Sequence, residues 1–198
     1  MTAESTTPSP TALRALAHPV RLRMLGLLRL EGPATASGLA VRLGLNSGAT
    51  SYHLRQLAEH GFVVDDLDRG NGRERWWRAA HYTTHVPNGD DGDEATRDAQ
   101  NAFLQAAAVT YNRQIQQAVE EQSTLDPEWR SASDFSDWSL RLTPDEAHSL
   151  IRELHAVMDR YRWWRHDDEQ DAPADAEQFR VLMQAFPRPG AVASEDDL

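Results

Sequence analysis

Residues 46–61, with the sequence NSGATSYHLRQLAEHG, decide the fold of the N-terminal part of this chain. Asn46 or Ser47 can cap the start of a helix, and Gly61 can end it. Three side chains recur at the i, i+4 and i+7 spacing of one helix face and predict a buried stripe: Thr50, Leu54 and Leu57. We therefore expect a single amphipathic helix over residues 47–60.

The opposite face of this helix carries small polar groups, one phenol and one guanidinium: Ser47, Gly48, Ser51, Tyr52 and Arg55. An arginine can bond guanine through two donors, serine can bond bases or phosphate, and the first backbone N–H groups of a helix can hold a phosphate. The pattern favours a helix that reads a DNA groove, which we call the reader helix. An ordinary surface helix is the alternative.

Three more helices are expected before the reader helix, at residues 11–17, 19–30 and 35–43. Pro19 fits the first turn of the second helix, while Gly32 and Pro33 end it. The tight turn LGLNS, residues 43–47, joins the third helix to the reader helix. Two short helices around such a turn are typical of a helix-turn-helix.

Two strand patterns follow at once, FVVDDL at residues 62–67 and RERWWRA at residues 73–79. Asn71-Gly72 lies between them and is a strong signal for a two-residue hairpin turn. A helix-turn-helix followed by a β-hairpin predicts a winged helix. The hairpin, or wing, supplies three basic residues that can contact the DNA backbone or the minor groove: Arg69, Arg73 and Arg75.

The segments LRALAHPVRLRMLGLL, TASGLAVRLGLNSGATSYHLRQLAEHGFV and DRGNGRERWWRAA resemble the DNA-binding region of ArsR-type bacterial transcription regulators. The resemblance covers residues 11–82. It implies a dimeric regulator, often a repressor, that reads a near-palindromic operator. It places the family's reader helix at residues 47–60 and its wing at residues 68–75. The longer C-terminal part, with LRLTPDEA and LMQAFPRP, resembles extensions of actinobacterial regulators of this type.

The chain of 198 residues has a formal net charge of -11, but the charge is uneven. Residues 1–85 hold ten arginines against seven Asp and Glu, and residues 86–198 hold ten against 24. The DNA-binding half is therefore mildly basic, and the acid lies downstream. The chain has no cysteine, so the thiolate metal sensing of many ArsR-type proteins does not carry over.

Beyond a linker at residues 86–93 we expect a long helix over 94–122 and a loop over 123–136. Alternating apolar residues predict strands at 138–142 and 179–186. A capping box at residues 143–146 begins a helix that reaches about residue 164. The expected fold class is α+β and mostly α, a winged helix-turn-helix followed by a long helix and a small helix-plus-strand region.

Other chemistry receives less support from the sequence. His148 and His155 lie two turns apart on one helix, too far for one ion, although a dimer could add ligands such as His166. An aromatic and methionine-rich interior could hold a small apolar effector, or it could be simple core: Trp138, Met158, Trp163 and Met183. No nucleophile–base pattern or phosphate loop indicates an enzyme, and we expect no cofactor.

These patterns divide the chain into a lead-in at residues 1–10, a DNA-binding domain at 11–85, a dimerisation and sensing region at 94–190 and a tail at 191–198. The expected function is that of a cytoplasmic homodimer that binds double-stranded DNA, with residues 94–122 and 10–17 at the interface and no membrane span. The alternative is a winged-helix adaptor whose acidic half docks a protein partner.

Overall fold

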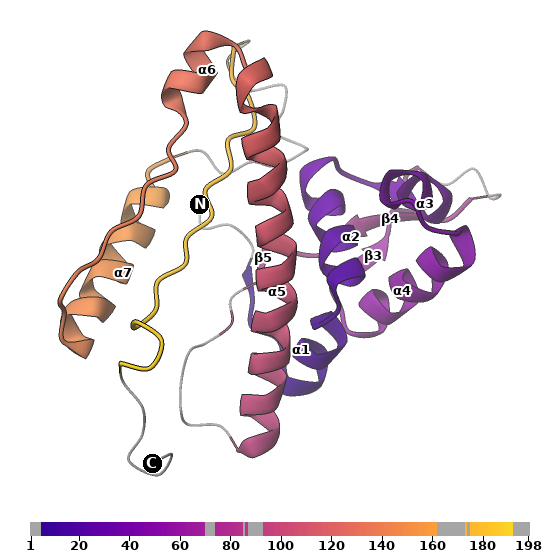
Figure 1. Cartoon of the computed structure of the whole chain (residues 1–198). Helices are drawn as coiled ribbons and strands as arrows, with labels where there is room; N and C mark the ends of the chain where they lie inside the picture. Colours follow the sequence, from indigo (N-terminus) through magenta and orange to yellow (C-terminus); the bar gives the residue numbers. More distant parts are fainter. Residues whose placement is uncertain are drawn as a thin grey trace. The chain divides into compact units, whose positions relative to one another are not determined.

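The computed structural model describes residues 5–69, 74–84, 86, 93–161, 173 and 175–191. The chain divides into two compact units. Unit 1 comprises Met1–Ser133 with Trp163–Pro173, and unit 2 comprises Asp134–Arg162 with Ala174–Leu198. The expected fold class, α+β and mostly α with a winged helix-turn-helix, is confirmed (Figure 1).

Two helices open unit 1, α1 (Pro10–Leu16) and α2 (Pro19–Leu30), and each begins with proline after a side-chain cap. The Ser9 hydroxyl accepts a bond from the Ala12 N–H at 3.3 Å. The His18 imidazole caps α2, because its Nδ1 accepts the Val20 N–H at 3.1 Å. Capping of this kind satisfies backbone donors that the first helical turn leaves free.

The helix-turn-helix proper consists of α3 (Ala36–Leu43) and α4 (Ser47–Glu59), and α4 is the reader helix. Gly44 ends α3 in the left-handed region, with φ of 66°, where a side chain would cost free energy. Asn46 then caps α4 by accepting the Ala49 N–H at 2.8 Å. The turn can be short because Gly44 at its start and Asn46 at its end are suited to the backbone conformation at these positions.

The wing sheet has three short antiparallel strands in the order β2–β4–β3. They are β2 (Ala34–Thr35), β3 (Val63–Asp65) and β4 (Trp76–Ala79). The β3–β4 pairing aligns Val63 with Ala79 and Asp65 with Trp77, which confirms the predicted hairpin, although its tip at residues 70–73 lies outside the described residues. Strand β2 was not predicted, because two residues are too few to show alternation. A further pair, β1 (Ser5–Thr6) and β5 (Thr83–Thr84), runs parallel.

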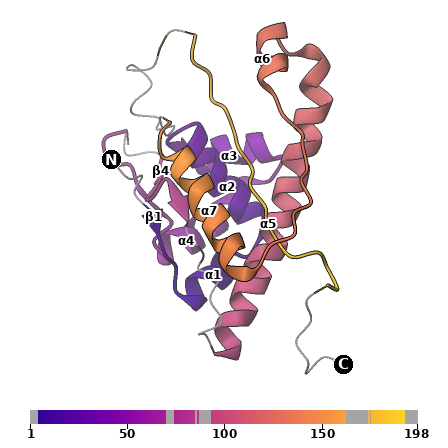
Figure 2. The same ribbon diagram turned by 90° about the vertical axis from the view of Figure 1, so that its left-hand side faces the viewer.

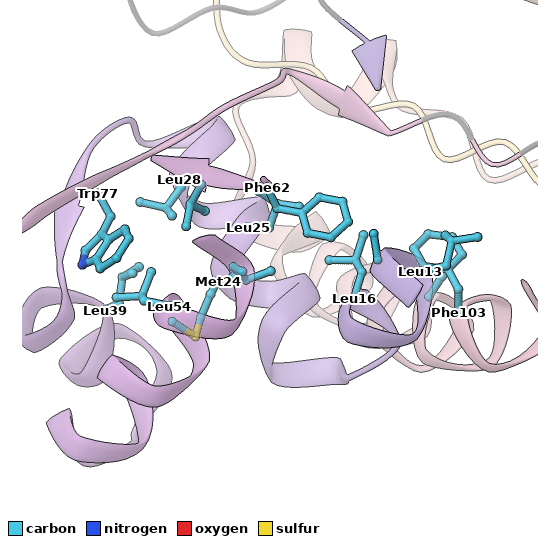
Figure 3. Close-up of a cluster of buried hydrophobic side chains, with 14 of the residues drawn as sticks. Leu13, Leu16, Met24, Leu25, Leu28, Leu39, Leu54, Phe62, Trp77 and Phe103 are labelled. Carbon is cyan, nitrogen blue, oxygen red and sulfur yellow. The ribbon is translucent and has the colours of Figure 1, made fainter. Parts of the chain in front are cut away.

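One apolar core joins the helices of unit 1 to the wing (Figure 3). Met24, Leu25 and Leu28 of α2 lie at its centre, with Leu54 and Leu57 of α4 fully buried against them. Trp77 of β4 is also buried, whereas Trp76 is only half-buried. The core sets the orientation of α4, since its buried stripe fixes which face remains exposed.

Helix α5 (Glu94–Glu121) runs alongside α1 and α2 in both views of the molecule (Figures 1 and 2). Its first half contributes Ala99, Phe103 and Ala107 to the same core. None of its residues after Thr110 is buried. The expected loop at 123–136 is corrected, because it contains a 3-10 turn (Gln122–Thr124) and α6 (Pro127–Ala132), which Asp126 caps by accepting the Glu128 N–H at 3.1 Å.

Unit 2 contains one described helix, α7 (Pro144–Met158), which ends before the predicted residue 164. The predicted capping box is formed, with Thr143 and Glu146 bonding each other's backbone N–H. The predicted strands at 138–142 and 179–186 are wrong: neither segment has strand structure. Alternating apolar and polar residues give a segment one apolar face, but a strand also needs a neighbouring strand with which it forms hydrogen bonds.

No helix in the described ranges is long and apolar enough to cross a membrane.

Candidate nucleic-acid interface

The reader helix α4 presents to solvent the face that the sequence predicts. Thr50, Leu54 and Leu57 have no exposed surface, so the residues between them point outward. Four of the five predicted contact residues on α4 are exposed, and Ser51 is half-buried: Ser47, Gly48, Ser51, Tyr52 and Arg55. Tyr52 is 54% exposed, enough for both its ring edge and its hydroxyl to reach a ligand.

Arg55 lines a groove of about 410 Å³ between α4, the start of α3 and strand β4. Ser51 shares the α4 wall, while Glu74, Arg75 and Trp77 form the wing wall. In the part of the chain that the structure describes, no carboxylate forms an ion pair with Arg55. Its guanidinium donors are therefore available for guanine edges or phosphate oxygens.

The start of α3 also lines this groove, through three residues that were not predicted from the sequence: Thr35, Ala36 and Ser37. Thr35 uses its hydroxyl to cap α3 by accepting the Gly38 N–H at 3.1 Å. The Ser37 side chain is exposed beside it. The segment ATAS contains an N-cap signal that could have identified this wall, but its position opposite Arg55 depends on the fold of the sheet.

Arg75, at the base of the wing, is exposed, but its guanidinium is held by neighbouring side chains. Its guanidinium forms a two-pronged bond with Asp65, in which Nη2 lies 2.6 Å from Oδ2. The same group lies 4.0 Å from the centre of the Trp77 ring. The bond from Arg75 lowers the pKa of the Asp65 carboxyl. These contacts indicate that Arg75 fixes the wing against β3, so part of its charge is already neutralised.

The remaining wing residues differ in what the structure shows of them. Arg69 is exposed and lies 3.5 Å from an Asp66 carboxylate oxygen, a separation at which the pair is weak. Arg73 lies outside the described residues. Arg69 therefore keeps an exposed charge, and its predicted contact with DNA stays a prediction.

Two histidines meet behind the reader helix. The ring centroids of His18 and His53 lie 4.8 Å apart, and Tyr52 meets His53 edge-on at 5.4 Å. His18 has a structural role, because it caps α2. The Nδ1 atom of His53 is buried and has no hydrogen-bond partner among the described residues.

The other candidate sites are less developed. Among the described residues, no three His, Asp or Glu side chains come together as a metal site would need. His148 and His155 are exposed on α7, and His166 lies outside the described residues. The expected apolar interior is not enclosed in the described part of unit 2, since Trp138 is 74% and Met183 is 41% exposed.

Comparison with known proteins gives a family for the N-terminal part of the chain. Residues 16–65, from the end of α1 to β3, match the helix-turn-helix domain family. No curated protein matches the sequence.

Several solved structures are similar to parts of the chain. Reduced HlyU from Vibrio cholerae N16961 is 23% identical over 46% of this chain and 79% of that one, with a TM-score of 0.31. ZitR from Lactococcus lactis, in its apo form, is 15% identical over 72% and 82%, with a TM-score of 0.31. The transcriptional regulator Tm0710 from Thermotoga maritima is 15% identical over 72% and 76%, with a TM-score of 0.30.

The match at residues 16–65, the helix order and the wing sheet together define the class of protein. Unit 1 therefore contains a winged helix-turn-helix domain.

Proposed function

We propose that the chain is a dimeric repressor that reads a near-palindromic operator, with α4 in the major groove and the wing, residues 68–75, on the backbone or in the minor groove. The observation that carries this proposal is the polarity of α4. One face is fully buried in the core, and the other presents Tyr52 and Arg55 beside an open groove. One α-helix fits the major groove of B-DNA in this way.

The need for two copies follows from how little one reader helix can contact. A single helix reaches few base pairs, whereas two helices on a two-fold axis read half-sites about one DNA turn apart. The net charge of the chain, -11, adds long-range repulsion from DNA. Binding must therefore depend on close contacts, which a dimer doubles.

Helix α5 offers the surface for the second copy. Away from its buried face, it exposes an apolar stripe at helical spacing, formed by Leu104, Ile115 and Val119, which are 49%, 38% and 56% exposed. A stripe of this kind on a long helix can pack against a copy of itself. The predicted contribution of residues 10–17 is less direct, since α1 already packs its buried side on α5.

The DNA-binding proposal is tested with labelled duplexes that tile the region upstream of the chain's own gene. Footprinting locates the operator, and fluorescence anisotropy then compares wild type with Arg55→Ala. We expect the variant to lose about 1–3 kcal/mol of binding free energy and much of its discrimination between operator and random DNA. Arg152→Ala, which removes an exposed arginine of α7, is the matched control. Equal operator affinity for wild type and Arg55→Ala would exclude α4 as the reader.

The dimer is tested by sedimentation equilibrium of Ile115→Asp, which buries a charge in the proposed interface and should give monomers. Val109→Asp is the control on the same helix, because Val109 is 60% exposed but lies outside the stripe. A dimer that survives Ile115→Asp and dissociates with Val109→Asp would place the interface on another face of α5.

The adaptor alternative draws support from unit 2, whose large apolar side chains are exposed rather than packed. An adaptor would use this surface for a protein partner and would bind none of the tiled duplexes. The anisotropy titration therefore separates the two functions, since salt-dependent, sequence-specific binding supports the regulator.

A further inference from the structure

His18 and His53 connect the reader helix to the start of α2. His18 lies at the N-cap of α2, and His53 lies in the middle of α4, on the half-buried side next to Tyr52. Their ring centroids are 4.8 Å apart, so the rings are in contact. This contact therefore joins α2, whose side chains lie at the centre of the core, to the reader helix α4.

The hydrogen bonds at this contact require neutral imidazoles. Nδ1 of His18 accepts the Val20 N–H, so the ring proton must lie on Nε2. Protonation of His18 would turn that acceptor into a donor and remove the cap of α2, and it would add a positive charge at a helix N-terminus. Nδ1 of His53 is buried without a described partner, so a proton placed there would have no acceptor.

The groups around the two rings also oppose protonation. Arg21, one turn into α2, acts on both histidines with a like charge, and its Nε is buried without a described partner. Tyr52 of α4 meets the His53 ring edge-on. The charged groups on the other elements packed against α4 are already engaged: Arg42 with Glu31, Asp65 with Arg75, and Arg14 with the Ala95 carbonyl.

We propose that His18, Arg21 and His53 form a proton-sensitive joint that holds the reader helix on α2 at neutral pH and releases it in acid. This inference rests on the proposed DNA-binding function for its output, the affinity for the operator. The joint acts through the position of α4, since acid removes the cap of α2 and sets up repulsion between neighbouring cations at its contact with α4. Tyr52 and Arg55 then lose the fixed geometry that a groove requires.

The direction of the pH effect follows from the two histidines. Desolvation by burial is the main cause that lowers the pKa of His18 and of His53 below the ordinary value of 6.5, and Arg21 adds to it. Below that ordinary value the unfolded chain binds more protons than the folded chain. The stabilising contribution of the joint is therefore complete above about pH 6.5 and is lost as the pH falls through the lowered values.

The first test measures operator affinity by anisotropy from about pH 8 to about pH 5.5 at constant ionic strength. Wild type should lose affinity on the order of tenfold in acid. The double variant His18→Asn, His53→Gln should lose much less, because asparagine can still cap α2 and neither side chain titrates. His148→Gln, on the exposed face of α7, should behave as wild type. Affinity that rises in acid would overturn the joint, since it would mean that the histidines contact phosphate.

The second test needs no DNA and so separates failure of the joint from failure of the proposed function. Thermal unfolding of the full chain, followed by circular dichroism, should show a melting temperature that falls in acid for wild type and falls less for the double variant. If the double variant kept the full pH dependence of wild type, the joint would be excluded even if DNA binding were confirmed. If no duplex bound, the melting curves would still decide on the joint.

Discussion

Helices α4 and α7 have similar lengths, 13 and 15 residues, and both carry an apolar stripe, yet they differ in whether that stripe is buried. Helix α7 has the stronger local signals, with proline in its first turn, a complete capping box and two carboxylates at its start. Helix α4 has only a single cap and no acidic residue in its first turn. Nevertheless, α4 buries three residues completely, whereas α7 buries none.

The difference shows that local signals and tertiary packing are separate requirements. In α4, the stripe meets α2, α3 and β3, which supply complementary apolar surfaces within a short stretch of sequence. In unit 2, aromatic side chains of the flanking segments remain exposed, as Phe135, Phe179 and Phe186 show with 56%, 56% and 70%. A helix can thus be well specified by its sequence while its apolar face still lacks a partner.

The largest expected effect comes from truncating one leucine in each helix. Leu54→Ala should lower the free energy of unfolding by about 2–5 kcal/mol, because it opens a cavity in the centre of the unit 1 core. Leu154→Ala, at a position that is 36% exposed, should cost less than about 1 kcal/mol. Urea denaturation of both variants, monitored by circular dichroism, measures the contrast.

Equal losses for the two leucines would break the comparison. They would show that α7 is packed in solution, so its apolar face has a partner. Repeating the titration at several protein concentrations then identifies that partner, because stabilisation by a second copy grows with concentration. Leu154→Ala would in that case become less destabilising as the protein is diluted.

The helices and the β3–β4 hairpin of the winged domain could be predicted because each has a local signal in the sequence, which the two-residue strand β2 lacks. The spacing of Thr50, Leu54 and Leu57 gives the buried face, and the positive φ of Gly44 marks the turn. The predictions of C-terminal strands were wrong because the alternating pattern at residues 138–142 and 179–186 specifies an apolar face but does not specify a neighbouring strand. Strand pairing is a non-local property that a single segment does not contain.

In the candidate site, too, features within one helix could be predicted from the sequence, whereas contacts between elements could not. The exposure of Tyr52 and Arg55 follows from helix periodicity and was predicted. The pairing of Arg75 with Asp65 was not, because it depends on the register between β3 and β4. The His18–His53 contact was also missed, since it joins two residues that are 35 positions apart in the sequence.

The wing pair offers a prediction about DNA affinity rather than about stability. Asp65→Asn should release Arg75 from its two-pronged bond and leave more of its charge for DNA, so affinity for random DNA should rise about two- to fivefold at low salt. Anisotropy with random duplexes at two salt concentrations measures the change. Asp68→Asn, which removes an exposed carboxylate of the same wing, controls for net charge. An equal rise for both variants would show that only the charge matters and that the pair with Arg75 does not.

The smallest expected effects come from the two caps, and they differ in kind rather than in size. Asn46→Ala and Thr143→Ala each remove a side chain that accepts a backbone N–H, at 2.8 Å from Ala49 and 3.3 Å from Glu146, and each should cost its helix about 1 kcal/mol. Because α4 shares the core, the loss at Asn46 should lower the melting temperature of the whole winged domain. Because α7 buries nothing, the loss at Thr143 should only increase fraying, seen as faster amide exchange within α7 at an unchanged melting temperature. A lower global melting temperature for Thr143→Ala would therefore mean that α7 folds together with the core, which its exposed surface in the single chain does not explain.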